Sequence, residues 1–153
     1  EKYNFISAYQ IHTDRDLENI RKTLAEQANT LRQEKQHQKE IREANTEIFE
    51  LWEKVQELNV EVSLYEEGYQ EFKEEYMQAE QLKRQLLDMG HTFESAERLC
   101  LNFQDKSHRL NEVLADVKRQ QRIGKKIMQE QKERMQSRDN QKNRERGAEK
   151  HDL

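Results

Sequence analysis

Proline is absent from all 153 residues of this chain, and only four glycines interrupt it. A compact globular fold needs many turns, and turns draw on glycine, proline, asparagine and aspartate. A chain with so few helix-ending residues is expected to run as long helices. The residue types that dominate it, Glu, Gln, Lys, Arg, Leu and Ala, are good helix formers. We therefore expect an all-α protein.

The composition argues against an ordinary globule. Hydrophobic residues make up 33% of the chain and charged residues 38%, whereas globular proteins usually have about 45–50% and about 25%. Disordered chains share such a composition, but here the apolar residues recur at helical spacing. We therefore expect an elongated coiled coil.

A helix start is predicted at Thr13, whose hydroxyl can cap a helix, with Asp16 three residues later as in a capping box. Residues 1–12 hold apolar side chains without a sustained period. We interpret them as an N-terminal arm, which is either frayed or docked on a partner. One long coiled-coil helix is expected over residues 13–89.

The first part of this helix has a weak seam. Apolar residues follow a 3–4 spacing from Leu17 to Val55, but four seam positions are polar: Gln27, Glu34, Gln38 and Asn45. Buried polar seam residues lower stability while fixing register and partner. They favour pairing with a different protein over self-pairing.

The seam strengthens from Leu51 onward. Two successive steps of three residues, Trp52 to Val55 to Leu58, form a stammer, which indicates local overwinding or a change of partner face. The aromatic residues that follow are bulky for a two-stranded core. We expect a protein interface formed by Leu51, Val55, Leu58, Val62, Tyr65, Tyr69, Phe72 and Tyr76.

A tight turn is predicted near Gly90, which suits the left-handed position after a helix. Thr92 can cap the next helix, which we expect over residues 90–135. If the turn reverses the chain, this second helix packs antiparallel on residues 45–89. Residues 13–44 would then need a partner chain.

The second helix continues the predicted interface. After it, residues 136–153 contain one large apolar side chain, Leu153, and are expected to be a basic, disordered tail. The interface residues of the second helix are Phe103, Leu110, Leu114 and Val117.

Residues Ile48 to Leu110 resemble a spectrin-type repeat boundary. Leu51 and Trp52 resemble the Trp-bearing third helix of one repeat, and the residues around Gly90 resemble the helix-turn-helix of the next. The similar stretch covers 63 of the 153 residues. The resemblance implies a rod or spacer module without an active site.

No pattern in the sequence points to catalysis, a cofactor or a metal. There is no Gly-rich phosphate loop, HExxH or CxxC motif, and the five histidines do not pair at helical spacing. Cys100, the single cysteine, is expected to be a core thiol; a reactive thiol or an interchain disulfide is the alternative. We therefore expect a protein that is not an enzyme.

Charge is divided unevenly along the chain. Residues 47–80 carry eleven Glu against two Lys, a net of −9, and residues 118–153 carry twelve Lys or Arg against six Asp or Glu, a net of +6. These are either solvated helix faces or two docking surfaces of opposite sign. The candidate residues for binding an acidic surface are Lys118, Arg119, Arg122, Lys125 and Lys126.

The sequence thus predicts a structural or scaffold coiled-coil subunit of a larger assembly, in cytoskeletal, ciliary, kinetochore-like or tethering machinery. The alternative is an adaptor whose basic helix binds an acidic surface, such as a microtubule or an anionic membrane. The expected partners are other coiled-coil proteins, in a heteromeric complex, and a cytoskeletal filament. Nucleic acid is disfavoured because the net charge is −4. No apolar run is long enough for a membrane span, and we expect an intracellular protein of the cytoplasm or cytoskeleton.

Overall fold

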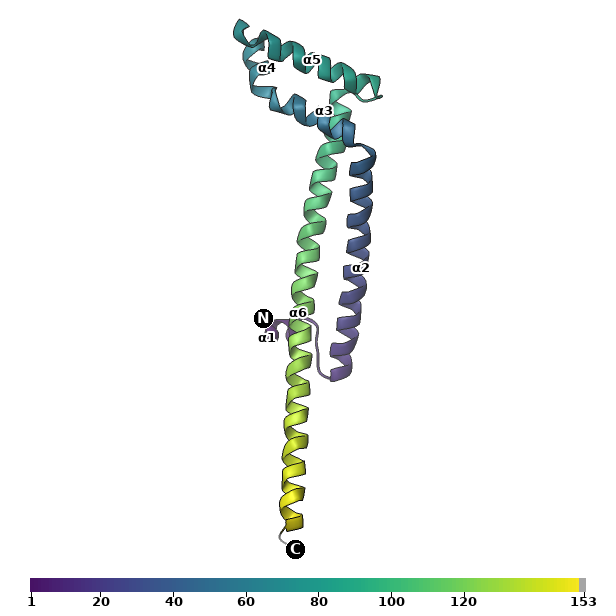
Figure 1. The fold of residues 1–153 in the computed structure, drawn as a ribbon, viewed down its shortest axis with the longest axis vertical. Coiled ribbons are helices and arrows are strands. Elements are labelled where there is room, and N and C mark those ends of the chain that lie inside the picture. Colours follow the sequence, from purple (N-terminus) through teal and green to yellow (C-terminus); the bar gives the residue numbers. More distant parts are fainter. Residues whose placement is uncertain (152–153) are drawn as a thin grey trace. The chain divides into compact units, whose positions relative to one another are not determined.

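A computed structural model describes the backbone of residues 1–151 and the side chains of residues 1–147. Figure 1 shows helices throughout this part of the chain and no strand, which confirms the predicted all-α class. The elements in chain order are α1 (Lys2–Ala8), α2 (Asp14–Ala44), α3 (Thr46–Glu57), α4 (Asn59–Glu66), the 3₁₀ helix η1 (Gln70–Phe72), α5 (Lys73–Asp88) and α6 (Phe93–His151).

These elements form two compact units. Unit 1 contains residues 1–32 and the chain from residue 112 onward, and unit 2 contains residues 33–111. The helices α2 and α6 each contribute to both units. Among the described residues, no helix has the length and apolar character that crossing a membrane requires.

In unit 1, α2 and α6 lie side by side and run antiparallel (Figure 1). Leu17 and Met128 line one groove of this pair, and Leu31 and Val113 line another, which sets the register. Each large apolar side chain that is fully buried stabilises the fold by about 1.5–3 kcal/mol. The buried core of unit 1 consists of Phe5, Leu17, Leu24, Ala28, Leu114, Val117 and Ile127.

The segment before α2 is also part of this core. Residues 1–12, expected to be an arm, form α1 and a turn, and Phe5 is only 4% exposed. Gln10 ends α1 in the left-handed region with φ 51°. Gly124 of α6 lies beside Phe5: a Cβ there would make an ordinary contact, 3.5 Å, with the Phe5 ring and a tighter one, 3.3 Å, with the Arg21 side chain.

The expectation that residues 13–44 need a partner chain is therefore wrong for the part from Leu17 to Leu31. These residues pack on α6 of the same chain. The apolar stripe passes through Ala28, which is fully buried, while the seam position Gln27 is exposed. A small residue at the contact lets two helices approach closely, so Ala28 takes the place that the heptad pattern gave to Gln27.

Unit 2 is built on α3, which has two buried faces. One face packs Ile48 and Leu51 against Leu86 of α5 and Ala96 of α6. The other packs Phe49 and Trp52 around Cys100. The Phe49 ring meets the Phe103 ring nearly at right angles at 5.1 Å, and the Arg42 guanidinium lies 4.3 Å from the Phe49 ring centroid.

The single helix expected over residues 13–89 is instead divided, first at Asn45 and Leu58. The Asn45 side chain donates a hydrogen bond to the Ile41 carbonyl at 2.8 Å, and such bonds compete with the helical backbone pattern. Leu58 has φ −92° and ψ 2° and separates α3 from α4. This break coincides with the predicted stammer.

The third division is a reversal at Gly68, which the heptad pattern concealed. Gly68 has φ 112°, its N–H donates to the Tyr65 carbonyl, and the Tyr69 N–H donates to the Leu64 carbonyl. These two bonds define a Schellman motif, which ends a helix at a left-handed residue. The α4–α5 hairpin therefore replaces the predicted straight seam through this region.

The predicted turn at Gly90 is confirmed as a second Schellman motif. Gly90 has φ 86°, its N–H donates to the Leu87 carbonyl, and the His91 N–H donates to the Leu86 carbonyl. The Thr92 hydroxyl then accepts the Ser95 N–H at 3.1 Å and caps α6.

The predicted capping box at the start of α2 is also present. The Thr13 N–H donates to the Asp16 carboxylate at 3.2 Å, and the Asp16 N–H donates to the Thr13 hydroxyl at 3.1 Å. The hydrogen bonds from the backbone N–H of His12 and from Thr13 lower the pKa of Asp16.

The second helix is longer than predicted. It was expected to end at residue 135, but α6 continues to His151 through the segment expected to be disordered. Good helix formers make up seven of the eleven residues from 136 to 146, and no glycine interrupts the segment before Gly147. The last two residues of the predicted tail lie outside the described residues.

Replacing either reversal glycine with alanine is expected to destabilise the fold. Gly68→Ala and Gly90→Ala force a Cβ into the left-handed region, which costs about 1–2 kcal/mol each. No atom lies within 4 Å of either added Cβ, so the cost is one of backbone conformation alone. Urea unfolding followed by circular dichroism measures it. Gly147→Ala, within α6, is the control and should not destabilise; equal losses at all three sites would contradict the assignment.

Adjacent residues of α6 provide a test of the intrachain core. Leu114 is 5% exposed and Val113 is 49% exposed. Leu114→Ala should lower the free energy of unfolding by about 2–5 kcal/mol, and Val113→Ala by less than about 1 kcal/mol. Because the core is intrachain, the loss should be the same at every protein concentration. A loss that grows on dilution would show that Leu114 packs against another chain.

Candidate binding surfaces

A basic groove in unit 1 gathers residues from two helices. Its volume is about 300 Å³, and Arg32 of α2 joins four residues of α6 in its lining. The predicted Lys118, Arg122 and Lys125 lie at i, i+4 and i+7, which places them on one face of α6. Sequence reasoning missed Arg32, because its place depends on the register between the helices. The complete lining is Arg32, Lys118, Gln121, Arg122 and Lys125.

The four cations of this groove are exposed, and its lining contains no carboxylate. Like charges held close together on a surface create a positive potential that attracts anionic groups. The other two predicted basic residues, Arg119 and Lys126, are exposed but do not line the groove.

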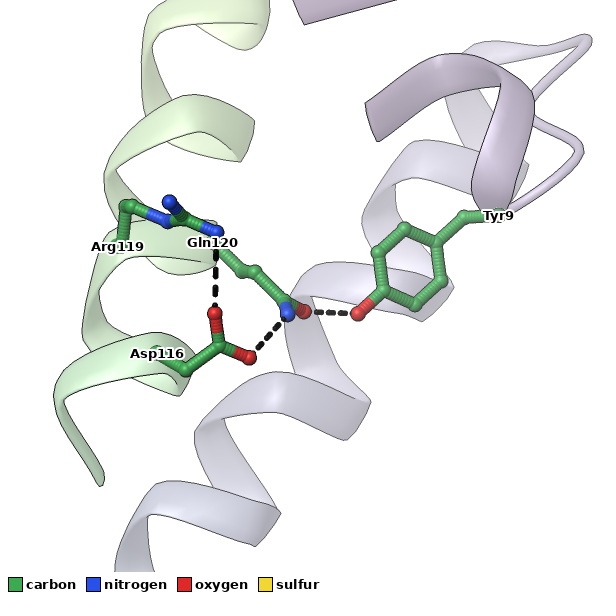
Figure 2. A network of polar contacts seen from close by, with 4 residues as sticks. All are labelled: Tyr9, Asp116, Arg119 and Gln120. Atoms are coloured by element: carbon green, nitrogen blue, oxygen red, sulfur yellow. Dashed lines mark hydrogen bonds and ion pairs between the residues drawn. The ribbon is translucent and has the colours of Figure 1, made fainter. Parts of the chain in front are cut away.

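Arg119 belongs instead to a polar network between α1 and α6 (Figure 2). Its guanidinium donates to Asp116 at 3.2 Å, and the Gln120 amide donates to the same carboxylate at 2.8 Å. The Tyr9 hydroxyl donates in turn to the Gln120 carbonyl oxygen. The network ties the end of α1 to α6.

This network borders a second groove, of about 520 Å³. Glu26 and Asp116 supply its charge, Leu31, Val113 and Val117 supply its apolar surface, and its described lining contains no Lys or Arg. Unit 1 thus has one groove lined by cations and another that contains carboxylates.

A second contact of α1 lies further along α6. The Lys2 ammonium forms an ion pair with Glu130, and this hydrogen bond lowers the pKa of the Glu130 carboxyl. Both side chains keep a substantial part of their surface in water, 35% for Lys2 and 46% for Glu130, so the pair adds little stability. Its effect is to fix where α1 lies.

The predicted aromatic seam lies around the α4–α5 hairpin of unit 2. The Tyr65 and Tyr76 rings face each other across it, with centroids 4.7 Å apart and planes inclined by 32°. Tyr69 sits beyond the reversal and is 53% exposed. Val62 and Phe72 are half-buried.

Acidic side chains surround this hairpin. The exposed carboxylates nearest the reversal are Glu66, Glu67, Glu71 and Glu74, and Lys73 is the one exposed cation from residue 66 to 74. Their net charge is −4 + 1 = −3. Such a surface attracts cationic groups.

Four of the twelve predicted interface residues are buried inside the chain. Leu51 and Val55 are buried in unit 2, and Leu114 and Val117 are buried in unit 1. Burial within the chain leaves these four without apolar surface for a partner. The other eight keep part of their surface exposed: Leu58, Val62, Tyr65, Tyr69, Phe72, Tyr76, Phe103 and Leu110.

Cys100 is fully buried, which confirms its predicted core position. Burial raises the pKa of its thiol to about 11, and the effect of Glu53 in the same direction is countered by Arg42. A thiol with a raised pKa is a poor nucleophile at neutral pH. Across the described residues, no three His, Cys, Asp or Glu side chains gather as a metal site would need.

No protein-family model, curated protein or solved structure matches this chain. The resemblance to spectrin-type repeats over Ile48 to Leu110 therefore stays a prediction.

The burial of Cys100 predicts slow labelling by thiol reagents. Raising the thiol pKa from 9.0 to about 11 lowers the thiolate fraction near neutral pH about a hundredfold. The pair Cys100→Ser with Ser137→Cys, which moves the thiol to an exposed position of α6, is the control and should label rapidly. Equal rates for the two proteins under native conditions would contradict the buried position.

The same shift predicts how stability depends on pH. The folded thiol holds its proton to a higher pH than the unfolded thiol, so stability is retained below pH 9 and falls as the pH rises towards 11. Cys100→Ser should flatten that part of the stability profile, measured by urea unfolding.

Proposed function

We propose that this chain is a structural scaffold subunit of a larger protein assembly. The observation that carries the proposal is the uncovered end of α6. Among the side chains described as far as residue 147, Ile127 is the last buried one of this helix, and every residue from Lys132 to Arg146 is exposed.

A helical segment whose side chains are all exposed gains little stability from packing. The packed part of α6 supplies the helix nucleus, so this segment depends on propagation alone, which adds little free energy per residue. Contact with a partner would stabilise this segment. Met135, 60% exposed, is its one large apolar side chain, so the contact would rest on charge.

The charge of the segment indicates the kind of partner. Residues 132–146 carry six Lys or Arg and three Asp or Glu, a net of +3. An acidic helix of another protein fits such a surface, in agreement with the heteromeric partner expected from the polar seam positions. Cytoskeletal, ciliary, kinetochore-like and vesicle-tethering assemblies all use long helical subunits, and an intracellular location is part of the proposal.

The second candidate function is an adaptor that binds an acidic surface, such as a microtubule or an anionic membrane. The basic groove favours it, because Arg32 joins Lys118, Arg122 and Lys125 there. The scaffold role ranks first because the α6 segment offers a whole helix for pairing, whereas the groove offers one cluster of charge.

Charge reversal in the α6 segment tests the scaffold role. Arg138→Glu with Lys142→Glu should remove the partner chains that co-purify with the full-length protein, because these side chains are exposed and would repel an acidic partner. Quantitative mass spectrometry of the purified complex measures the loss. Cross-links from Lys132 to the partner should disappear with it.

Arg138→Lys with Lys142→Arg preserves the charge and is the matched control. Both variants should keep the thermal stability of the two cores, since Arg138 and Lys142 are exposed. If the charge-reversed protein retains the same chains at the same stoichiometry, α6 is not the docking segment.

A further inference from the structure

We propose that the basic groove of unit 1 binds the acidic α4–α5 hairpin of a second copy of this chain. The inference goes beyond the scaffold role and does not involve residues 132–146. It rests on two surfaces of opposite charge, each described within its own unit.

The groove offers a receptor with a defined charge pattern. Lys118, Arg122 and Lys125 line one wall from a single helix, and Arg32 faces them from α2. The four cationic side chains are exposed to water. The fifth residue that lines the groove is Gln121, which can donate or accept a hydrogen bond. A ligand that neutralises them needs several carboxylates held on one convex surface.

The hairpin presents such a surface. Its reversal at Gly68 is short, so Glu66 and Glu67 at the end of α4 lie close along the chain to Glu71 and Glu74 at the start of the return. Tyr69, exposed between them, offers an aromatic face on which an Arg guanidinium can stack. Convex shape, carboxylates and an aromatic side chain complement the groove.

The hairpin also contains carboxylate oxygens that lack donors. Glu61 and Glu75 each bury one oxygen with no hydrogen-bond partner in the described structure. A buried acceptor without a partner is unfavourable. Because these two oxygens are buried, a docking side chain would not reach them, and the contact would rest on the exposed carboxylates of the hairpin.

A second copy is the occupant that the chain itself points to. Two basic grooves repel each other, as do two hairpins, so of these three pairings the groove-to-hairpin contact is the favourable one. Such a contact is heterologous, and it leaves a free groove on one copy and a free hairpin on the other. Association would therefore continue into chains of copies, unless the rotation between copies closes a ring.

Light scattering coupled to size exclusion, over a range of concentrations, tests the proposal. The wild-type chain should grow in mass with concentration at about 50 mM salt and return to a monomer at about 500 mM, because salt screens exposed charges. Arg122→Glu with Lys125→Glu (the groove variant) reverses two of the four positive charges of the groove. Glu71→Lys with Glu74→Lys (the hairpin variant) reverses two of the four negative charges of the hairpin. Each variant alone should be a monomer, with affinity reduced about tenfold or more.

The mixture of the two variants gives the decisive result. The hairpin variant keeps a wild-type groove and the groove variant keeps a wild-type hairpin, so together they should form a dimer that grows no further. Arg122→Lys with Lys125→Arg, which keeps the charge, should associate as the wild type does. All substituted residues are exposed, and circular dichroism should show unchanged helicity.

Three results would overturn the proposal. These are a wild-type monomer at every concentration in low salt, a mixture that stays monomeric, and wild-type association that survives loss of the groove. A monomer that sediments with anionic vesicles, and loses this with the groove variant, would assign the groove to lipid instead. Arg138 and Lys142 are unchanged in all of these variants. A negative result would therefore contradict self-association and would not contradict the proposed docking role of the α6 segment.

Discussion

Both hydrophobic cores of this protein depend on backbone reversals at left-handed residues. Gln10, Gly68 and Gly90 occupy the same position after a helix, and the N–H groups that follow donate to the carbonyls of the preceding turn. A chain with 33% hydrophobic residues cannot surround a globular core. It can bury those residues only by folding helices back on one another. The reversal at Gly90, for example, brings Leu86 and Ala96 into one cluster.

Local chemistry was sufficient to predict some of these features from the sequence. The Thr13 box, the Gly90 turn and the Thr92 cap each involve residues within a few positions of one another, so their hydrogen bonds follow from residue type and spacing. Gly68 was missed for the opposite reason. The aromatic residues from Tyr65 to Tyr76 keep a 4–3 spacing across the reversal, and periodicity alone cannot show that the backbone has turned. A glycine inside the pattern was the available signal.

The residues of the binding surfaces also fall into those that the local sequence predicts and those that depend on how distant segments pack. Lys118, Arg122 and Lys125 were predictable because they share one helix face, whereas Arg32 reaches the groove through the register of α2 against α6. The apolar seam at Leu114 was also predicted, but its partner was expected to be another protein or residues 45–89, whereas Leu114 packs in the cluster of Leu24 and Ala28 of α2. Heptad patterns indicate that a helix pairs and do not indicate whether the partner helix belongs to the same chain.

Because many apolar residues are buried within the chain, the exposed surface must bind partners mainly through charged side chains. The end of α6, the basic groove and the acidic hairpin all present charge with few large apolar side chains. Exposed ion pairs contribute about 0.2–1 kcal/mol each and weaken with salt, while complementary charge accelerates encounter. One such surface would hold a partner only briefly. A stable position in an assembly then requires several of them to be engaged together, because linked weak contacts reinforce one another through effective concentration. A scaffold built this way would assemble through many simultaneous contacts and release each of them readily.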